Sequence, residues 1–448
     1  MNTKIIATLG LTLALALSAA ACGGGNGGGS EAASATGPIK IWLSNNPEEI
    51  AWGREMVAAW NAKNPDQKIS AQEIPAGKTS EEVIGAAITA GNAPCLVFNT
   101  SPAAVPQFQK QGGLVALDSF EDGKEYIETR TGPAAEQYKS PDGSYYQIPW
   151  KSNPVMIFYN KDLLKKAGID PENPPLATYD EFLATSKKIV DSGAADAAIW
   201  PAPTSEKIVS SNAAQAAIWP APTSEFFQSW FDFYPLYAAE TGGKQLVEDG
   251  KATFDSPEGK AVAEFWHTMY DKGYAQKEKY NGDSFGDAKA AMSIVGPWAI
   301  AVYGDKINWG AAPVPTSEGT APEETYTFSD AKNVAIYSAC NAQGTAWEVL
   351  KFATSEEQDG SLLEKTGQMP LRENIEAAFP DYFKAHPDYK TFAAQSARTV
   401  EVPNIPNSIE IWQKFRDQYT SSVIFGKSNV DAALSKAARE VDDLAGQS

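Results

Sequence analysis

The chain has 448 residues, a formal net charge of −19 and a pI near 4.7. Phosphate backbones are bound through basic surfaces, so this acidic composition argues against a nucleic-acid partner. With two histidines in the whole chain, there is little material for a histidine-based catalytic triad or metal centre, and we expect neither a metal nor a cofactor.

The first 21 residues have the pattern of an export signal. Lys4 gives a short basic start, Ile5 to Leu17 form an almost continuous apolar run, and residues 18–21 are small. The run is shorter than the roughly 18 to 20 residues that a stable spanning helix needs. We therefore expect a signal peptide at 1–21 and an exported mature chain.

Cys22 follows these small residues and precedes the glycine-rich stretch 23–36. The arrangement resembles bacterial lipoproteins, in which the cysteine carries a lipid and a flexible tether follows. It predicts a lipidated Cys22 with a tether at 22–37 and a protein anchored on the outer face of the cell membrane. Ala19 stands where such signals usually have leucine, so cleavage after Ala21 without lipidation is the alternative.

The next part of the chain alternates between strand and helix patterns, which predicts a βαβαβ unit with a mostly parallel sheet. Helix starts are marked by Asn46 with Glu49 and by Thr79 with Glu82, each an N-cap with a glutamate three residues on. The expected elements are Ile39–Leu43, Glu48–Lys63, Lys68–Ile74, Ser80–Ala90 and Leu96–Asn99.

A second α/β region begins with a strand at Val155–Tyr159 and a helix at Tyr179–Val190, which Thr178 and Glu181 cap. Glycine and proline breaks separate the later helices. These are Pro257–Lys272, Ala346–Ala353, Ser408–Ser422 and Val430–Leu444. Two α/β lobes are the simplest architecture for this order.

Residues 188–206 and 207–225 are tandem copies of 19 residues, identical at 16 positions. A single pair is not a solenoid, which needs at least three units. We interpret it as a duplication accommodated in a surface loop, where added length costs little. The alternative is an additional wall on a ligand cleft.

Tryptophan is abundant, with twelve in the chain, and Trp150, Trp230, Trp298 and Trp412 stand at predicted loop or strand ends. An indole ring stacks on the apolar face of a pyranose, and planar amides, carboxylates and guanidinium groups suit its hydroxyls. The pattern favours a sugar site, although any one tryptophan can instead belong to the core.

Several motifs in order resemble family 1 extracellular solute-binding proteins, with the maltose- and maltodextrin-binding members most similar. The resemblance covers Pro38 to about Leu444. Its motifs are Trp42 with residues 44–46, Ala93–Phe98, Ile157–Leu163, Gly296–Trp298, Ala346–Phe352 and Pro403–Pro406 ahead of Trp412.

The resemblance implies a two-lobed periplasmic-binding-protein-like fold of type II, with a hinge of three crossing strands and a ligand cleft between the lobes. It places lobe 1 at 38–148 plus 326–355 and lobe 2 at 149–325 plus 356–446. The lobes would close on the ligand by a hinge motion. We expect a monomer that captures a mono- or oligosaccharide and delivers it to the transmembrane subunits of an ABC permease.

The same resemblance implies the ligand-facing positions. Trp298 and Trp412 match sugar-stacking tryptophans, and Arg416 follows one helical turn after Trp412. Asn153 stands where maltodextrin receptors tend to have a carboxylate, and Asn99 where an aromatic often lies. The full set is Asn46, Asn99, Trp150, Asn153, Trp230, Phe231, Trp298, Asp330, Arg372, Trp412 and Arg416.

Cys95 and Cys340 are the remaining cysteines. Two cysteines so far apart can be buried as small hydrophobic residues, but export also permits a disulfide. In the layout that the resemblance implies, the strand at 333–337 runs antiparallel beside the strand that Cys95 begins. We therefore predict that the two are bonded.

Two other functions stay open at this point. An exported glycoside hydrolase would also combine aromatic residues with carboxylates, two of which would flank the scissile bond. A receptor for a polyol, a peptide or another non-sugar solute could use the same scaffold, because a fold does not fix its ligand. We favour the receptor for a saccharide over an enzyme.

Overall fold

The computed structural model describes residues 32–44, 46–76, 79–200, 219–220, 228–280 and 282–446, with side chains left out at 219–220, 228–231 and 279. The expected signal peptide and Cys22 lie outside these residues. Within the described part, no helix is long and apolar enough to cross a membrane.

The last residues of the expected tether pack on the folded body. A short helical turn covers 32–34, and the carbonyl of Ala35 accepts hydrogen bonds from the amides of Gly344 and Thr345. The amide of Gly37 donates to Thr345 Oγ1 at 3.0 Å. The folded chain therefore begins several residues before position 38.

Lobe 1 is built on a five-stranded sheet with the order β2-β1-β3-β14-β4. The three N-terminal strands are parallel, whereas β14 is antiparallel to both of its neighbours. Strands β2, β1, β3 and β4 therefore run in one direction, as the sequence predicts, and β14, which enters from the other lobe, runs against them. The strands are β1 (Ile39–Leu43), β2 (Ile69–Glu73), β3 (Leu96–Thr100), β4 (Ile148–Lys151) and β14 (Lys332–Ile336).

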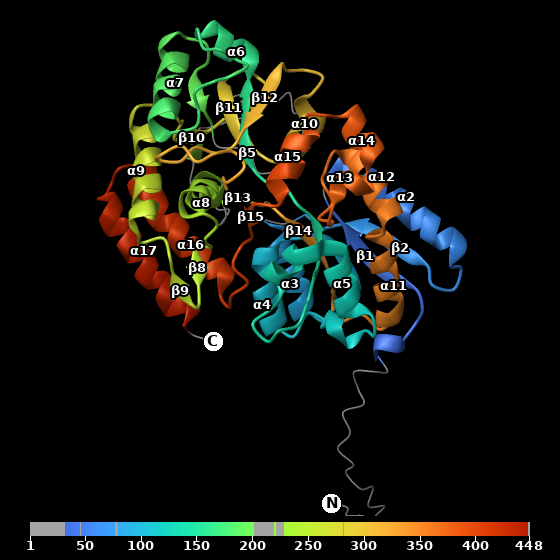
Figure 1. Cartoon of the computed structure of the whole chain (residues 1–448). Helices are drawn as coiled ribbons and strands as arrows, with labels where there is room; N and C mark the ends of the chain where they lie inside the picture. Colours follow the sequence, from blue (N-terminus) through green and yellow to red (C-terminus); the bar gives the residue numbers. More distant parts are fainter. Residues whose placement is uncertain are drawn as a thin grey trace, which may run out of the picture.

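Helices cover this sheet. They are α2 (Pro47–Lys63), α3 (Ser80–Thr89), η1 (Pro102–Ala104), α4 (Val105–Lys110), η2 (Leu117–Ser119), α5 (Gly123–Thr131), η3 (Gly132–Tyr138), α11 (Gln343–Ala353) and α12 (Glu356–Thr366). The expected boundary at 355 would put α12 in lobe 2. In the structure Trp52 Nε1 on α2 donates to the carbonyl of Gln358 at 3.1 Å, and Leu362 shares the core of lobe 1. Helix α12 thus packs with lobe 1 (Figure 1).

Lobe 2 has a four-stranded sheet with the order β12-β5-β11-β6. Strand β5 is antiparallel to both neighbours, and β6 is parallel to β11. The strands are β5 (Met156–Asn160), β6 (Ala197–Ile199), β11 (Ala290–Val295) and β12 (Trp309–Ala312). Two-stranded pairs are β7 (Trp219–Pro220) with β10 (Glu278–Lys279), β8 (Val247–Glu248) with β9 (Lys251–Ala252), and β13 (Thr327–Phe328) with β15 (Thr399–Val400).

Most helices of lobe 2 begin or end close to the positions expected from capping and glycine signals. The reciprocal capping box of Thr178 and Glu181 is formed at the start of α7. The helices are α6 (Lys161–Lys166), α7 (Tyr179–Asp191), α8 (Gln228–Thr241), α9 (Pro257–Asp271), α10 (Trp298–Tyr303), α13 (Ile375–Ala378), α14 (Pro380–Ala385), α15 (Tyr389–Ser396), α16 (Ser408–Tyr419), the π-helical turn η4 (Thr420–Ile424) and α17 (Val430–Ala445).

Three segments lie side by side where the chain passes between the lobes. The amide of Ser152 donates to Met369 O and that of Leu371 to Trp150 O, both at 2.9 Å. On the other side, an antiparallel bridge joins Pro154 to Ser329. The expected fold class, two α/β lobes with a hinge of three crossings, is confirmed (Figure 1).

A disulfide joins Cys95 to Cys340. Strand β14 runs antiparallel beside β3, and the amide of Tyr337 donates to the carbonyl of Cys95 at 3.0 Å. The bond links the start of β3 to the turn after β14. It ties together two strands that are far apart in the sequence.

Candidate functional site

Polar side chains from lobe 1 meet at the hinge. Lys151, the last residue of β4, places its Nζ atom 2.5 Å from Glu49 Oε1 and 3.1 Å from Asn99 Oδ1. Nε2 of the Gln368 side chain donates to the same Glu49 oxygen. Glu49 and Lys151 are 4% and 1% exposed. Burial lowers the pKa of Lys151, and the Glu49 carboxylate only partly offsets this effect.

A second polar group lies on the hinge segments beside it. Asn153 Nδ2 donates to the carbonyl of Asp330 at 2.9 Å, and Lys332 Nζ donates to Asp330 Oδ1 at the same distance. Burial alone would lower the pKa of Lys332, but the Asp330 carboxylate raises it above its usual value. Asn153 Oδ1 is buried and has no hydrogen-bond partner among the described residues.

Trp298 stands next to this group. It opens α10 directly after Gly296 and Pro297, and it is partly buried against a cluster of lobe 2. A Cβ atom at Gly296 would lie 3.0 Å from Asn153 Cβ and 3.4 Å from Trp298 Cδ1. Because Gly296 has no side chain, the backbone there lies close to both residues, and Trp298 is near Asn153. The structure therefore gathers four of the expected positions at the hinge, Asn99, Asn153, Trp298 and Asp330. Together with Glu49, Lys151, Lys332 and Gln368 they are called the hinge group below.

Other expected positions serve the fold in this conformation. Trp150 is 1% exposed and packs between Trp52 and Phe98, with ring centroids 5.4 and 5.2 Å away. Trp412 is 0% exposed within the main core of lobe 2. Neither indole offers an accessible face to a ligand here.

Arg372 lies outside the hinge group, since its Nε donates to Asp359 Oδ2 and its Nη2 to the carbonyl of Thr354, each at 3.1 Å. Asn46 caps α2 by accepting from the amide of Glu49 at 2.9 Å, and it is partly exposed. The expected rim residues Trp230 and Phe231 belong to α8, and their side chains lie outside the described residues.

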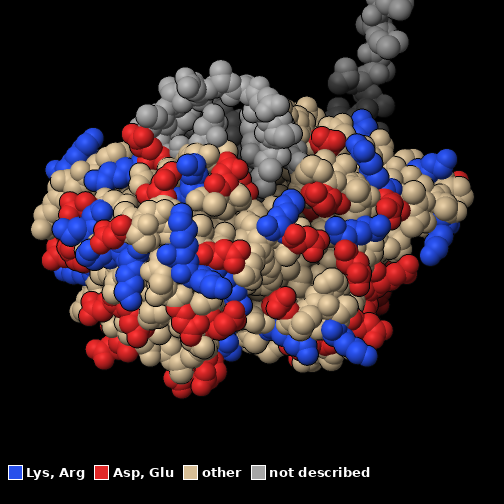
Figure 2. Space-filling view, turned by 90° about the horizontal axis from the view of Figure 1, so that it is seen from above, with Lys and Arg blue, Asp and Glu red and all other residues tan. Residues whose placement is uncertain are grey.

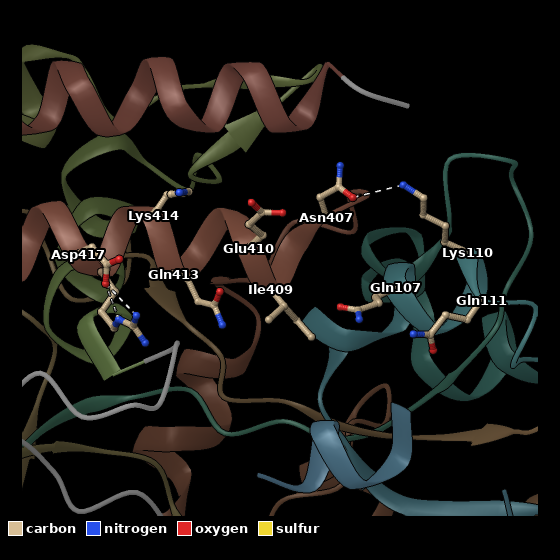
Figure 3. A pocket seen from close by; sticks show the side chains of 10 residues that line it. Gln107, Lys110, Gln111, Asn407, Ile409, Glu410, Gln413, Lys414 and Asp417 are labelled. Atoms are coloured by element: carbon tan, nitrogen blue, oxygen red, sulfur yellow. Dashed lines mark hydrogen bonds and ion pairs between the residues drawn. The ribbon is translucent and has the colours of Figure 1, made fainter. Parts of the chain in front are cut away.

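A groove of about 600 Å³ lies between α4 of lobe 1 and α16 of lobe 2 (Figure 3). Arg416 lines it and forms an ion pair with Asp417 at 2.7 Å. Four side-chain amides also line it. The full lining is Gln107, Lys110, Gln111, Asn407, Ile409, Glu410, Gln413, Lys414, Arg416 and Asp417.

The lobes touch directly beside this groove. Lys110 Nζ donates to Asn407 Oδ1 at 3.3 Å, and Ser408 Oγ donates to the carbonyl of Ala103 on η1. Ile409 packs against core clusters of both lobes. The structure thus shows a conformation in which α16 rests on lobe 1.

Sequence reasoning missed Glu49, Lys151 and Gln368. The sequence predicts Glu49 as the N3 partner of Asn46 in a capping box, but in α2 only Asn46 accepts, from the amide of Glu49. Its carboxylate turns to Lys151 instead. The available signal was Lys151 itself, a charged residue within the otherwise apolar strand β4.

The charges of the described surface are mixed. Figure 2 shows Lys and Arg interspersed with Asp and Glu over the face seen from above. Among the described residues, no group of three or more His, Cys, Asp or Glu side chains is arranged to hold a metal ion. The hinge group can provide hydrogen bonds and an aromatic surface for stacking.

Comparison with known proteins gives the family. The family described as bacterial extracellular solute-binding protein matches residues 55–391. The diacetylchitobiose binding protein DasA of Streptomyces coelicolor is 26% identical over 461 residues, covering 97% of this chain and 96% of that protein. The maltodextrin-binding protein MdxE of Bacillus subtilis is 25% identical over 338 residues, covering 72% of this chain and 71% of that protein.

Among solved structures, the cyclic α-maltosyl-1,6-maltose binding protein of Arthrobacter globiformis superposes with a TM-score of 0.74 at 20% identity. The match covers 92% of this chain and 100% of that one, so the two share a fold. The family match spans well over half of the sequence. The chain belongs to the bacterial extracellular solute-binding proteins.

Proposed function

We propose that this protein is the carbohydrate receptor of a bacterial ABC importer. It captures a mono- or oligosaccharide, of a maltose or α-glucoside type, between its lobes and delivers it to the permease subunits. The observation that carries the proposal is the meeting of Asn99, Asn153 and Asp330 with Trp298 at the three-segment hinge. Relatives named for diacetylchitobiose and maltodextrin binding support the ligand class.

The residue types at the hinge fit a sugar. Side-chain amides donate and accept in a plane, which suits adjacent hydroxyls, and a partly exposed indole can stack on the C–H face of a pyranose. Asn153 Oδ1 has an unused acceptor position, and a buried acceptor without a partner carries a free-energy cost that a ligand hydroxyl would relieve.

A receptor, and not a hydrolase, is the function that these contacts favour. A glycosidase needs two carboxyl groups free to act as acid and as base or nucleophile. Two carboxylates at the hinge are paired, Glu49 with Lys151 and Asp330 with Lys332. In our proposal the protein binds its ligand without covalent chemistry or a cofactor.

The proposed location rests on the N-terminal sequence. We propose that residues 1–21 direct export and that Cys22 carries the lipid that holds a monomeric receptor on the outer face of the membrane. The short stretch from Cys22 to the docked residues near Ala35 would keep lobe 1 close to the bilayer. Metabolic labelling with a radioactive fatty acid, in the wild type and in Cys22→Ser, tests the anchor.

Thermal unfolding tests the ligand class. The chain from residue 23 is melted alone and with glucose, maltose, maltotriose, N,N′-diacetylchitobiose, a polyol and a peptide mixture. A ligand that binds only the folded state raises the melting temperature by mass action. A rise with a saccharide, with the saccharide recovered intact after long incubation, supports the proposal. A melting-temperature rise only with the polyol or peptides would refute a sugar as the ligand. Hydrolysis of the saccharide would refute the receptor function.

A further inference from the structure

One oxygen of Glu49 is left over in the hinge group. Its Oε1 atom accepts two hydrogen bonds, from the ammonium of Lys151 and from Nε2 of the Gln368 side chain. Its Oε2 atom is buried and has no hydrogen-bond partner in the described part of the chain. A charged oxygen in this condition is costly, so it normally meets a water or a ligand donor.

Residues from three parts of the chain meet at this carboxylate. Glu49 lies in the first turn of α2, Lys151 at the end of β4, and Gln368 on the segment that leaves α12 for lobe 2. Two of these three positions are on hinge crossings. The carboxylate is therefore positioned where the lobes meet. It lies near Asn99, because the Lys151 ammonium donates to both side chains.

Charge in the hinge group is balanced. Glu49 is compensated by Lys151 and Asp330 by Lys332, and in the groove Arg416 is paired with Asp417. Lys151 and Glu49 have lost most of their solvent, so neither charge can be left unpaired without a large cost. No positive charge of the hinge group is in excess to receive an anionic ligand.

We propose that Glu49 Oε2 accepts a hydrogen bond from a hydroxyl of the bound saccharide, with Lys151 and Gln368 as positioning residues, and that the cleft selects uncharged sugars over phosphorylated ones. This inference rests on the proposed function. It adds a ligand contact that is not aromatic, and it predicts that the ligand is uncharged.

The test uses the saccharide that gives the largest rise in melting temperature. Its affinity is measured by calorimetry for the wild type, Glu49→Gln, the charge-balanced double variant E49Q/K151M, and Glu48→Gln. Glu48 is the matched control, because it is the preceding residue of α2 and is exposed. The double variant removes both charges, so the unpaired ammonium that would weaken folding in E49Q alone is absent.

We expect E49Q/K151M to bind at least about tenfold more weakly, since a hydrogen bond to a charged acceptor is worth roughly that factor or more. E48Q should bind as the wild type does. Monodeoxy analogues of the sugar give the second readout. One analogue should bind the wild type about tenfold more weakly than the parent sugar, and that penalty should vanish in the double variant.

Three outcomes overturn the inference while leaving the receptor in place. They are an unchanged affinity in E49Q/K151M, equal penalties for every deoxy analogue in both proteins, and a melting-temperature rise with glucose 6-phosphate as large as with glucose. If the double variant does not fold, Glu49→Asp replaces it, because it keeps the charge but shortens the reach. The absence of any rise with any sugar would instead refute the proposed function.

Discussion

Arg130 and Asp359 form a buried ion pair in which Nη2 of the guanidinium donates to both carboxylate oxygens, at 3.0 and 2.8 Å. Arg130 also donates to the carbonyls of Pro149 and Leu371. Pro149 lies in β4 and Leu371 on the third crossing, so this pair ties α5 and α12 to two of the hinge segments. Arg372 adds a second cation to the same carboxylate.

Asp359→Ala should therefore be strongly destabilising. It leaves Arg130 buried without its counter-ion, and breaking a buried pair from one side costs about 3–5 kcal/mol. Urea unfolding followed by tryptophan fluorescence measures the free energy of unfolding. Glu357→Ala is the control, because Glu357 is an exposed residue of the same helix. If Asp359→Ala lowers the free energy of unfolding no more than the control does, the ion pair does not stabilise the hinge as described.

The two tryptophans expected to stack on the ligand should behave differently. Trp298 is partly buried beside Asn153, so Trp298→Ala should weaken saccharide binding about thirtyfold, as for an anchoring aromatic. Trp412 is fully buried in the lobe 2 core, and Trp412→Ala should cost about 3–5 kcal/mol of folding stability.

Calorimetric titration and urea unfolding of both variants separate the two effects. Trp200→Ala is the control, since the contacts of the Trp200 side chain with the described residues are a hydrogen bond to the carbonyl of Glu278 and a ring contact with Tyr280. Equal and normal sugar binding by all three variants would place the ligand elsewhere than beside Trp298. A stable Trp412→Ala protein with weakened binding would show that α16 moves to expose this indole when a ligand is bound.

Local signals were enough to predict much of the fold. The caps at Asn46, Thr79 and Thr178 mark helix starts that the structure has, because a capping contact spans only three residues. Local signals do not predict that β14 runs antiparallel in the lobe 1 sheet, because β14 and its partner β3 are more than 200 positions apart in the sequence.

The candidate site was predicted less completely, and for a similar reason. Asn99, Asn153, Asp330 and Trp298 were expected and meet at the hinge. The Glu49–Lys151 pair was missed because its partners are 102 positions apart and each has an ordinary local interpretation. Whether an indole such as Trp412 faces a cleft or a core depends on how helices pack, which residue spacing does not specify.

Folding stability should depend on the protonation of Glu401. Burial raises the pKa of this carboxyl from 4.5 to about 8, although the hydroxyls of Tyr138 and Ser329 and the charge of Lys332 oppose the rise, while Asp330 adds to it. The folded state then binds more protons than the unfolded state between these two values. The free energy of unfolding therefore falls as the pH rises from about 4.5 to 8.

Glu401→Gln cannot titrate, so its melting temperature should fall less between pH 5 and pH 8 than that of the wild type, and it should be the more stable protein at pH 8. Asp232, whose pKa burial raises from 3.8 to about 7, keeps part of the pH dependence in both proteins. Melting at matched ionic strength measures this, with exposed Glu376→Gln as control. Parallel pH curves for wild type and Glu401→Gln would contradict the prediction.

Deleting residues 207–225, the second copy of the duplication, should leave both stability and sugar affinity nearly unchanged. The first copy supplies β6, whose Ala197 and Ile199 pair with Ala290 and Met292 in the lobe 2 sheet. From the second copy the described structure includes only β7, a two-residue strand paired with β10. Halving a surface loop changes its closure free energy by only about 0.6 kcal/mol.

Melting curves and calorimetric titration of the deletion variant test this expectation. Deleting the first copy, 188–206, is the informative comparison, because it removes the end of α7 as well as β6. The two copies share the segment AAIWPAPTSE, so a first-copy deletion that stays fully stable would mean that residues 216–218 can occupy the place of β6. A second-copy deletion that keeps its stability but loses affinity would instead show that the duplicated segment forms a wall of the ligand cleft.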